Sequence, residues 1–296
     1  IEDLSNGSSS LRSKLPQTLD KCELLMRVGD EYRIQTEESA AWNDDFLEQS
    51  SRLANDFIPI EIDRNERIRQ KCSQLLKRVS IFQGESRVPR DLSPLFNGQL
   101  PNDSQKKIYI WIRDGWSIDE NSVRVDAKQA GTQSPTIFVF IPKLSADELR
   151  HYIIEYKAAE GTLEKKGIPN TPEGKEARAA IETIRQSAEV RIEELLEKAF
   201  SKAYVFQGGG NEILENDFPT KIQEAAKNAL QRLYPQFQVA DHPAWGKVYE
   251  KAKEGSPDAL KAVNHLGEVS NHPVCKLILG FIASGKSGSD IREHFE

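Results

Sequence analysis

The chain has 296 residues, of which 40 are basic and 46 acidic, so its formal net charge is −6. That balance excludes a surface coated with nucleic-acid-binding charge, although a single basic face remains compatible with it. No apolar run approaches the roughly 20 residues that a membrane-spanning helix needs. Cys22, Cys72 and Cys275 are too far apart for a disulfide framework or a zinc knuckle. We therefore expect a cytoplasmic protein without a membrane segment, and the elements below predict an α+β fold that is predominantly helical.

Residues 1–86 are expected to form a winged-helix-like piece followed by amphipathic helices. A short helix before residue 24 precedes two β-type runs, Leu24–Val28 and Tyr32–Thr36, which a glycine turn joins. A helix followed by a hairpin is the second half of a winged helix; a hairpin attached to a helical domain is the alternative. Thr36 then predicts the N-cap of a helix in which Trp42 begins an apolar stripe.

A second amphipathic segment, residues 64–79, carries the candidates for nucleic-acid contact. The basic residues around its apolar stripe that could touch phosphate are Arg64, Arg67, Lys71, Lys77 and Arg78. Asp63 and Glu66 lie among them, so a solvated, charge-rich face is the alternative. By the same argument Cys72 is a core residue and not a nucleophile.

Residues 104–206 are expected to form a small α/β unit. Residues 87–103 are rich in Pro, Asn and Gly and predict a linker. The continuous apolar runs at 106–116 and 135–143 predict strands covered on both faces. Ser145 with Glu148 predicts a capping box, and Thr171-Pro172 predicts a second helix start. Residues 145–200 should then form a long antiparallel helical hairpin that projects from the unit.

Two glycine-rich stretches follow, and the first is Gly208-Gly209-Gly210. Backbone amides of such a run can cradle an anion. No Lys or Arg stands immediately beside these glycines to hold a phosphate, so a hinge is the favoured interpretation.

Residues 211–296 are expected to be helical and to end in a truncated helix-turn-helix. Gly280, Gly285, Lys286 and Ser287 fit the phosphate-loop formula G-x-x-x-x-G-K-[ST]. A phosphate loop follows a buried strand, whereas the apolar residues from Val274 to Ile282 have the spacing of a helix. We interpret Gly285 as a turn between helices, Lys286 as solvated, and Ser287 or Ser289 as a cap. An NTPase site at Gly280–Ser287 is the least favoured alternative.

No catalytic residue and no metal ligand is nominated. The five histidines, at 151, 242, 265, 272 and 294, are scattered and lack metal-binding spacing. The many carboxylates offer no distinct acid–base pair.

Four stretches of the sequence together carry a resemblance to a known family. They are "MRVGDEYRIQTEESAAWNDDF", "EYKAAEGTLEKKGIPNTPEGKEARAAIE", "YVFQGGGNEI" and "SGKSGSDIREHFE". Together they resemble the region downstream of the ATPase core in the large P-loop protein of BREX phage-defence systems, the BrxC/PglY family. The resemblance spans nearly the whole chain and rests on diffuse similarity, without a catalytic signature.

The resemblance implies a bacterial ATPase as the parent protein, with ATP and Mg at a phosphate loop upstream of this chain. It implies that the chain is a fragment without a cofactor or ATPase activity of its own. Its expected role is a non-catalytic scaffold that contacts other BREX defence proteins, among them a methyltransferase, and DNA. A direct DNA-binding module that uses winged-helix-like elements is the alternative.

Overall fold

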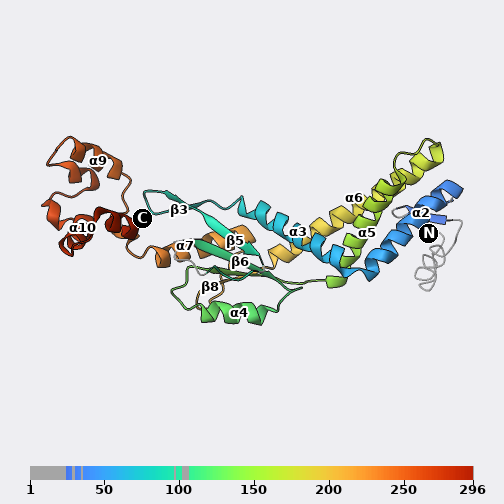
Figure 1. The fold of residues 1–296 in the computed structure, drawn as a ribbon, viewed down its shortest axis with the longest axis horizontal. Coiled ribbons are helices and arrows are strands. Elements are labelled where there is room, and N and C mark those ends of the chain that lie inside the picture. Colours follow the sequence, from blue (N-terminus) through green and yellow to red (C-terminus); the bar gives the residue numbers. More distant parts are fainter. Residues whose placement is uncertain (1–24, 29–30, 35, 97, 102–106, 296) are drawn as a thin grey trace. The chain divides into compact units, whose positions relative to one another are not determined.

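The computed structural model describes the chain except residues 1–24, 29–30, 35, 97, 102–106 and 296 (Figure 1). The described chain is α+β and predominantly helical, as expected. It divides into two compact units, residues 1–74 with 142–202 and residues 75–141 with 203–296. This division differs from the expected segments 1–86, 104–206 and 211–296, because the helices of 145–200 pack with the helix that begins at Glu37.

The first unit begins with a two-stranded hairpin and two helices. Strands β1 (Leu25–Val28) and β2 (Glu31–Ile34) pair antiparallel, which confirms the expected hairpin. The helix expected before them lies outside the described residues. Helices α2 (Glu37–Asn55) and α3 (Phe57–Leu76) follow. The Thr36 hydroxyl accepts a hydrogen bond from the backbone N–H of Ser39, so Thr36 is the predicted N-cap of α2.

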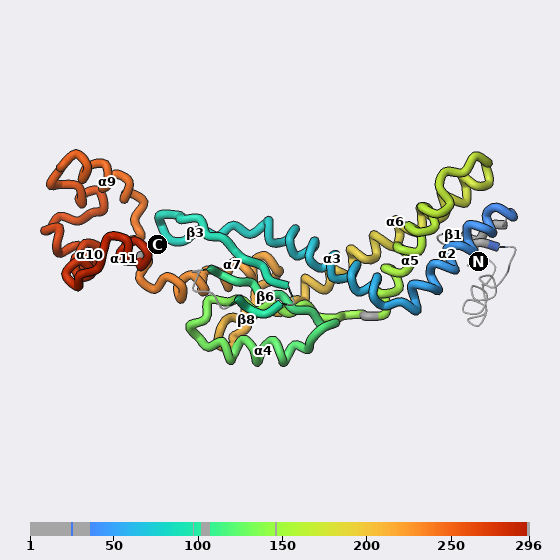
Figure 2. The backbone as a smooth tube through the Cα atoms, viewed as in Figure 1, coloured from blue at the N-terminus to red at the C-terminus, as the bar shows by residue number. Residues whose placement is uncertain are grey.

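Helices α5 (Ala146–Lys166) and α6 (Pro172–Ser201) form the expected hairpin, which Figure 2 traces as a continuous tube. Thr171 caps α6 through the backbone N–H of Gly174, and Pro172 takes the first helical position. Ser145 stands at the N-cap of α5 but its side chain makes no cap hydrogen bond, so the expected capping box is absent there.

Helix α2 packs against both helices of this hairpin. Trp42 of α2 lies in a buried cluster whose other members are Ala159, Leu163, Ala177 and Ile181 of α5 and α6. The alanines let the helix axes approach closely while Trp42 fills the space between them. The hairpin expected to project as an arm is therefore part of a three-helix bundle.

A four-stranded mixed sheet is the centre of the second unit. Its strand order is β5 (Leu92–Phe96), β6 (Ile108–Asp114), β7 (Ile137–Ile141) and β8 (Tyr204–Gln207). The first three strands are parallel, and β8 runs antiparallel to β7. Every residue of β7 is buried, which confirms the prediction of a strand covered on both faces.

Two helices cover the sheet (Figure 1). Helix α4 (Glu120–Gln129) packs Val123 and Ala127 against Phe138, Phe140 and Phe206 on one face. Helix α7 (Phe218–Leu233) contacts β6, β7 and β8 through the predicted apolar stripe that includes Ile222 and Leu230.

The expected linker over residues 87–103 is wrong in its first half. Strand β3 (Ile81–Gln83) pairs antiparallel with β4 (Val88–Arg90), and β5 follows as the edge of the main sheet. Pro89 in β4 and Pro94 in β5 gave these two strands the sequence pattern of a linker. An edge strand tolerates proline because one side of it makes no ladder hydrogen bonds.

Short helices make up most of the chain after α7, as expected. They are α8 (Phe237–Ala240), α9 (Trp245–Lys253), η1 (Ala259–Val263), η2 (Val269–Asn271), α10 (Pro273–Ala283) and α11 (Gly288–Phe295). Val248, Ala259 and Leu260 form the only core cluster described in this region, and it is small. Among the described residues, no helix is long and apolar enough to cross a bilayer.

We predict that Trp42→Ala lowers the free energy of unfolding of the first unit by about 3–5 kcal/mol, because it leaves a cavity between three helices. Denaturant titration followed by far-UV circular dichroism measures the loss. The matched control is Val190→Ala on α6, where the side chain is 57% exposed and the change should stay within about 0.5 kcal/mol. Equal losses in the two variants would contradict the assignment of Trp42 to the core.

Candidate interaction surfaces

The phosphate-loop formula at Gly280–Ser287 lies on a helix and the turn that follows it. Gly280 is inside α10, and Gly285 has a φ of 77°, so it forms a left-handed turn after the helix. The Ser287 hydroxyl accepts a hydrogen bond from the N–H of Asp290 at 3.2 Å, and the Ser287 N–H donates to Asp290 Oδ2 at 2.8 Å. Lys286 is exposed. The turn, the solvated lysine and the serine cap thus take the expected forms, and a helix leads into the formula where a phosphate loop has a strand.

The glycines at 208–210 close a tight turn after β8. The N–H of Gly209 donates to the carbonyl of Ala127, and the N–H of Gly210 donates to that of Gln207. A Cβ atom at Gly208 would lie 2.6 Å from the carbonyl oxygen of Gly131. These glycines allow close packing against the segment after α4, and two of their amides already have partners.

Two of the candidate phosphate contacts on α3 are paired with carboxylates. Arg67 bonds to Asp63 at 2.6 Å and to Glu189 of α6 at 2.8 Å. Lys71 lies 3.4 Å from Glu193 of α6 and also bonds to Glu197. Burial lowers the pKa of Arg67, but its hydrogen bonds to Glu189 and Asp63 outweigh burial and raise it. A phosphate group would have to displace these partners.

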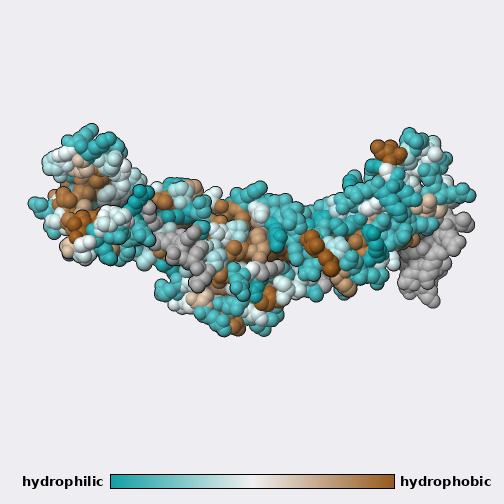
Figure 3. Space-filling view, in the orientation of Figure 1, coloured by the Kyte–Doolittle hydropathy of each residue, from teal (hydrophilic) through white to brown (hydrophobic). Residues whose placement is uncertain are grey.

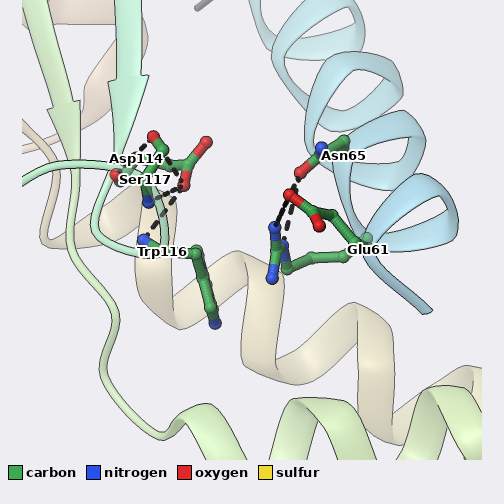
Figure 4. Close-up of polar contacts among 6 residues, drawn as sticks. Glu61, Asn65, Asp114, Trp116 and Ser117 are labelled. Carbon is green, nitrogen blue, oxygen red and sulfur yellow. Dashed lines mark hydrogen bonds and ion pairs between the residues drawn. The ribbon is translucent and has the colours of Figure 1, made fainter. Parts of the chain in front are cut away.

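The other basic candidates differ in exposure. Arg64 hydrogen-bonds to Asn65 and pairs with Glu61 at 3.5 Å. Figure 4 labels these two partners on α3. Lys77 and Arg78 follow the end of α3 and are exposed. Of the five candidates, these two are the most accessible to a ligand.

Cys72 is fully buried, and burial raises the pKa of its thiol to about 12. A thiol with that pKa is not a nucleophile at neutral pH. The prediction of a core cysteine is confirmed.

The carboxyl end of β6 places Asp114 in a tight turn. Its Oδ1 accepts hydrogen bonds from the N–H groups of Trp116 and Ser117 at 3.0 and 3.2 Å (Figure 4). Ligands of open α/β sheets bind beyond the carboxyl ends of the strands. Here the carboxylate of Asp114 accepts hydrogen bonds from the backbone of the turn that it begins.

An open groove of about 460 Å³ in the first unit is walled by charged side chains. The residues around it are Lys71, Glu193, Glu194, Glu197, Lys198 and Ser201. Lys71 already pairs with Glu193 and Glu197 in this groove, so a charged small molecule would have to compete with these ion pairs.

Helix α10 carries the most apolar surface of the C-terminal region. We call the side chains of Val274, Leu277, Ile278, Leu279, Phe281 and Ile282 the α10 surface. None of them is buried, and Leu279 and Ile282 are 45% and 54% exposed. Figure 3 shows hydrophobic atoms gathered where α10 lies. Contiguous exposed apolar residues usually mark an interaction site. The sequence predicted the stripe on this helix but not its exposure.

His272 begins α10 and has a specific environment. Its Nδ1 accepts a hydrogen bond from the Val274 N–H at 3.2 Å. Its ring meets those of Trp245 and His265 edge-on, with centroids 5.5 and 5.0 Å away. Burial, and next the neighbouring His265, lower the pKa of His272. The neutral ring is therefore the helix cap.

Among the residues that the structure describes, no three His, Cys, Asp or Glu side chains are placed to share a metal ion. In comparisons with known proteins, no family model, no curated protein and no solved structure matches the chain.

We predict that acidification destabilises the C-terminal helices through His272. Its pKa is lower in the folded chain than the ordinary value of 6.5, so the stability that the neutral ring contributes is complete above pH 6.5 and is lost as the pH falls below it. His272→Asn keeps a side-chain acceptor at the cap without the titration. Thermal unfolding at pH 7.5 and pH 5 should show a larger drop in Tm for the wild type than for this variant.

The control for this experiment is His151→Asn, since the side chain of His151 is 62% exposed. It should follow the wild type at both pH values. A His272→Asn variant that loses as much Tm as the wild type would show that another group senses the pH.

Proposed function

We propose that the chain is a non-catalytic interaction segment of a BREX-type ATPase, and that the α10 surface binds a partner protein of the same defence system. The resemblance in sequence supports the family. The α10 surface is the observation that carries the interaction, because four of its six large apolar side chains are only partly buried and Leu279 and Ile282 are about half exposed.

The free energy gained by burying apolar side chains favours binding of a partner over α10. Burying a large aliphatic side chain contributes about 1.5–3 kcal/mol. The core cluster beside α10 has only Val248, Ala259 and Leu260 as buried members, with Cys275 of α10 partly buried against it. A partner that covers Leu279 and Ile282 would supply apolar contacts that the C-terminal region lacks by itself.

We also propose that α10, the turn at Gly285 and α11 form the beginning of a helix-turn-helix. The two helices and the left-handed glycine between them support this interpretation. The β1–β2 hairpin supports a winged-helix-like element in the same way. A cytoplasmic location belongs to the same proposal.

Direct DNA binding is the second candidate function. The exposure of Lys77 and Arg78 favours it, whereas the ion pairs of Arg67 and Lys71 do not. An NTPase at Gly280–Ser287 is the third, and the helix before Gly285 does not favour it.

We predict that Leu279→Glu combined with Ile282→Glu abolishes binding of the partner, because two carboxylates at helical i, i+3 spacing would have to be buried unpaired. The chain is co-expressed with the methyltransferase and the other proteins of the defence system, and co-purification is measured. Val125→Glu on α4, where the side chain is 46% exposed, is the matched control and should leave the complex intact. A complex that survives the double change would exclude the α10 surface.

We predict that Mg-ATP leaves the Tm of the chain unchanged. A ligand that binds only the folded state must raise its apparent stability. A rise in Tm in the wild type that disappears in Lys286→Ala would establish a nucleotide site and overturn the non-catalytic proposal. The partner-binding experiment would still stand as a separate result.

A further inference from the structure

The turn between β3 and β4 holds a carboxylate from a distant part of the chain. The N–H groups of Glu85 and Ser86 donate to the two carboxylate oxygens of Asp241 at 2.8 and 2.9 Å. The Ser86 hydroxyl donates to the same side chain at 2.7 Å. We call these three donors the turn site.

The backbone of this turn is shaped for an anion. Gly84 has a φ of 66° and Arg87 a φ of 51°, and the Arg87 N–H closes the turn on the Gly84 carbonyl at 3.2 Å. A Cβ atom at Gly84 would lie 2.1 Å from Asp241 Oδ2, so only glycine lets the carboxylate approach. Successive N–H groups in a turn with left-handed residues form a concavity that binds anions.

The segment that runs from the turn after α3 to the end of β4 carries more basic than acidic residues, and an exposed Asp91 follows it. Residues 77–90 include the basic residues Lys77, Arg78, Arg87 and Arg90, and the acidic residue Glu85. Lys77, Arg78 and Arg87 are exposed. This local excess of positive charge contrasts with the net charge of −6 of the whole chain. It would attract a polyanion rather than an isolated carboxylate.

An exposed aromatic ring lies on the same hairpin. Phe82 is 48% exposed between the buried Ile81 and Gln83, and the Arg87 guanidinium stacks over it at 4.8 Å from the ring centroid. Surfaces that bind nucleic acid commonly expose aromatic rings and guanidinium groups beside other basic residues.

The segment that precedes Asp241 packs against the hairpin through Tyr234 and Phe237. The Arg90 guanidinium lies over the rings of Tyr234 and Phe237, 4.0 and 5.8 Å from their centroids. Asp241 directly follows α8, and α8 contacts α10. The hairpin, α8 and α10 therefore form a connected series.

We infer that the β3–β4 hairpin binds the phosphate backbone of nucleic acid, and that Asp241 occupies the phosphate position in this structure. Two carboxylate oxygens on two amides and a hydroxyl reproduce the contacts that two oxygens of a phosphodiester would make. Lys77, Arg78 and Arg87 would then contact neighbouring phosphates, and Phe82 would meet a base or sugar. Binding of this type depends on charge and not on base sequence.

Asp241 keeps the turn site closed at neutral pH. Burial raises the pKa of Asp241, but its hydrogen bonds to Ser86 and Glu85 outweigh burial and lower it, so the group stays ionised. Nucleic acid must displace this charge before it reaches the amides. The hairpin is therefore self-inhibited.

The first test measures DNA binding by the whole chain. Fluorescence anisotropy with a labelled duplex of mixed sequence is recorded at rising salt for the wild type, Asp241→Ala and Glu254→Ala. Glu254 is exposed at the end of α9, so its variant removes the same charge without touching the hairpin. Asp241→Ala should bind about threefold to tenfold more tightly than Glu254→Ala at low salt, with an affinity that falls steeply as salt rises. Equal affinities would overturn the inference.

The second test locates the contact. Adding Arg87→Glu to Asp241→Ala should remove the gain, since Arg87 is exposed and its loss leaves the strand pairing intact. In the wild-type background, Lys77→Glu with Arg78→Glu should weaken whatever binding the unaltered chain has, which keeps the test decisive if Asp241→Ala unfolds. Binding that persists in the charge-reversed variants would place the DNA elsewhere and overturn the inference.

The third test distinguishes the ligand. Amide NMR signals of Glu85 and Ser86 in Asp241→Ala should shift with inorganic phosphate and with the duplex. Shifts caused by an acidic peptide but not by the duplex would assign the turn site to a protein carboxylate and refute nucleic-acid binding. The turn site includes no residue of the α10 surface, so its failure would leave the proposal of partner-protein binding by α10 unaffected.

Discussion

Strand β7 pairs with β6 on one side and with β8 on the other. The pairing with β8 is the more demanding one, because two long helices separate β8 from β7 in the sequence. Between β7 and β8 the chain leaves the sheet, forms α5 and α6, and then returns to pair antiparallel with the strand that it left. The cost of closing such an excursion grows only slowly with its length. The helical hairpin of α5 and α6 turns the chain back within this excursion, which lets β8 reach β7.

The same arrangement distributes the charged residues. Arg67 and Lys71 of α3 form ion pairs with carboxylates of α6, so they stabilise the helices of the first unit. Lys77 and Arg78 in the turn after α3, and Arg87 in the β3–β4 turn, remain exposed, whereas Arg90 is half-buried. One run of Lys and Arg in the sequence therefore divides into a structural part and a part open to ligands.

Local patterns predicted much of this fold. The strands β6 and β7, the caps at Thr36 and Thr171 and the helix before Gly285 follow from neighbouring residues alone. Strands β4 and β5 were missed because Pro89 and Pro94 resemble linker residues, and their pairing with β3 and β6 shows that they belong to sheets. The candidate sites show the same limit. Nothing near Asp241 in the sequence points to a turn more than a hundred residues earlier, and the exposure of α10 depends on how little packs around it.

Gly84 decides what the turn site can hold. Because the carboxylate of Asp241 rests where a Cβ atom would stand, a methyl group at position 84 would expel it, and the same methyl group would keep a phosphate oxygen out of that place. The bare glycine therefore admits both kinds of anion. Which of them fills the turn depends on their charge and local concentration, and not on the backbone.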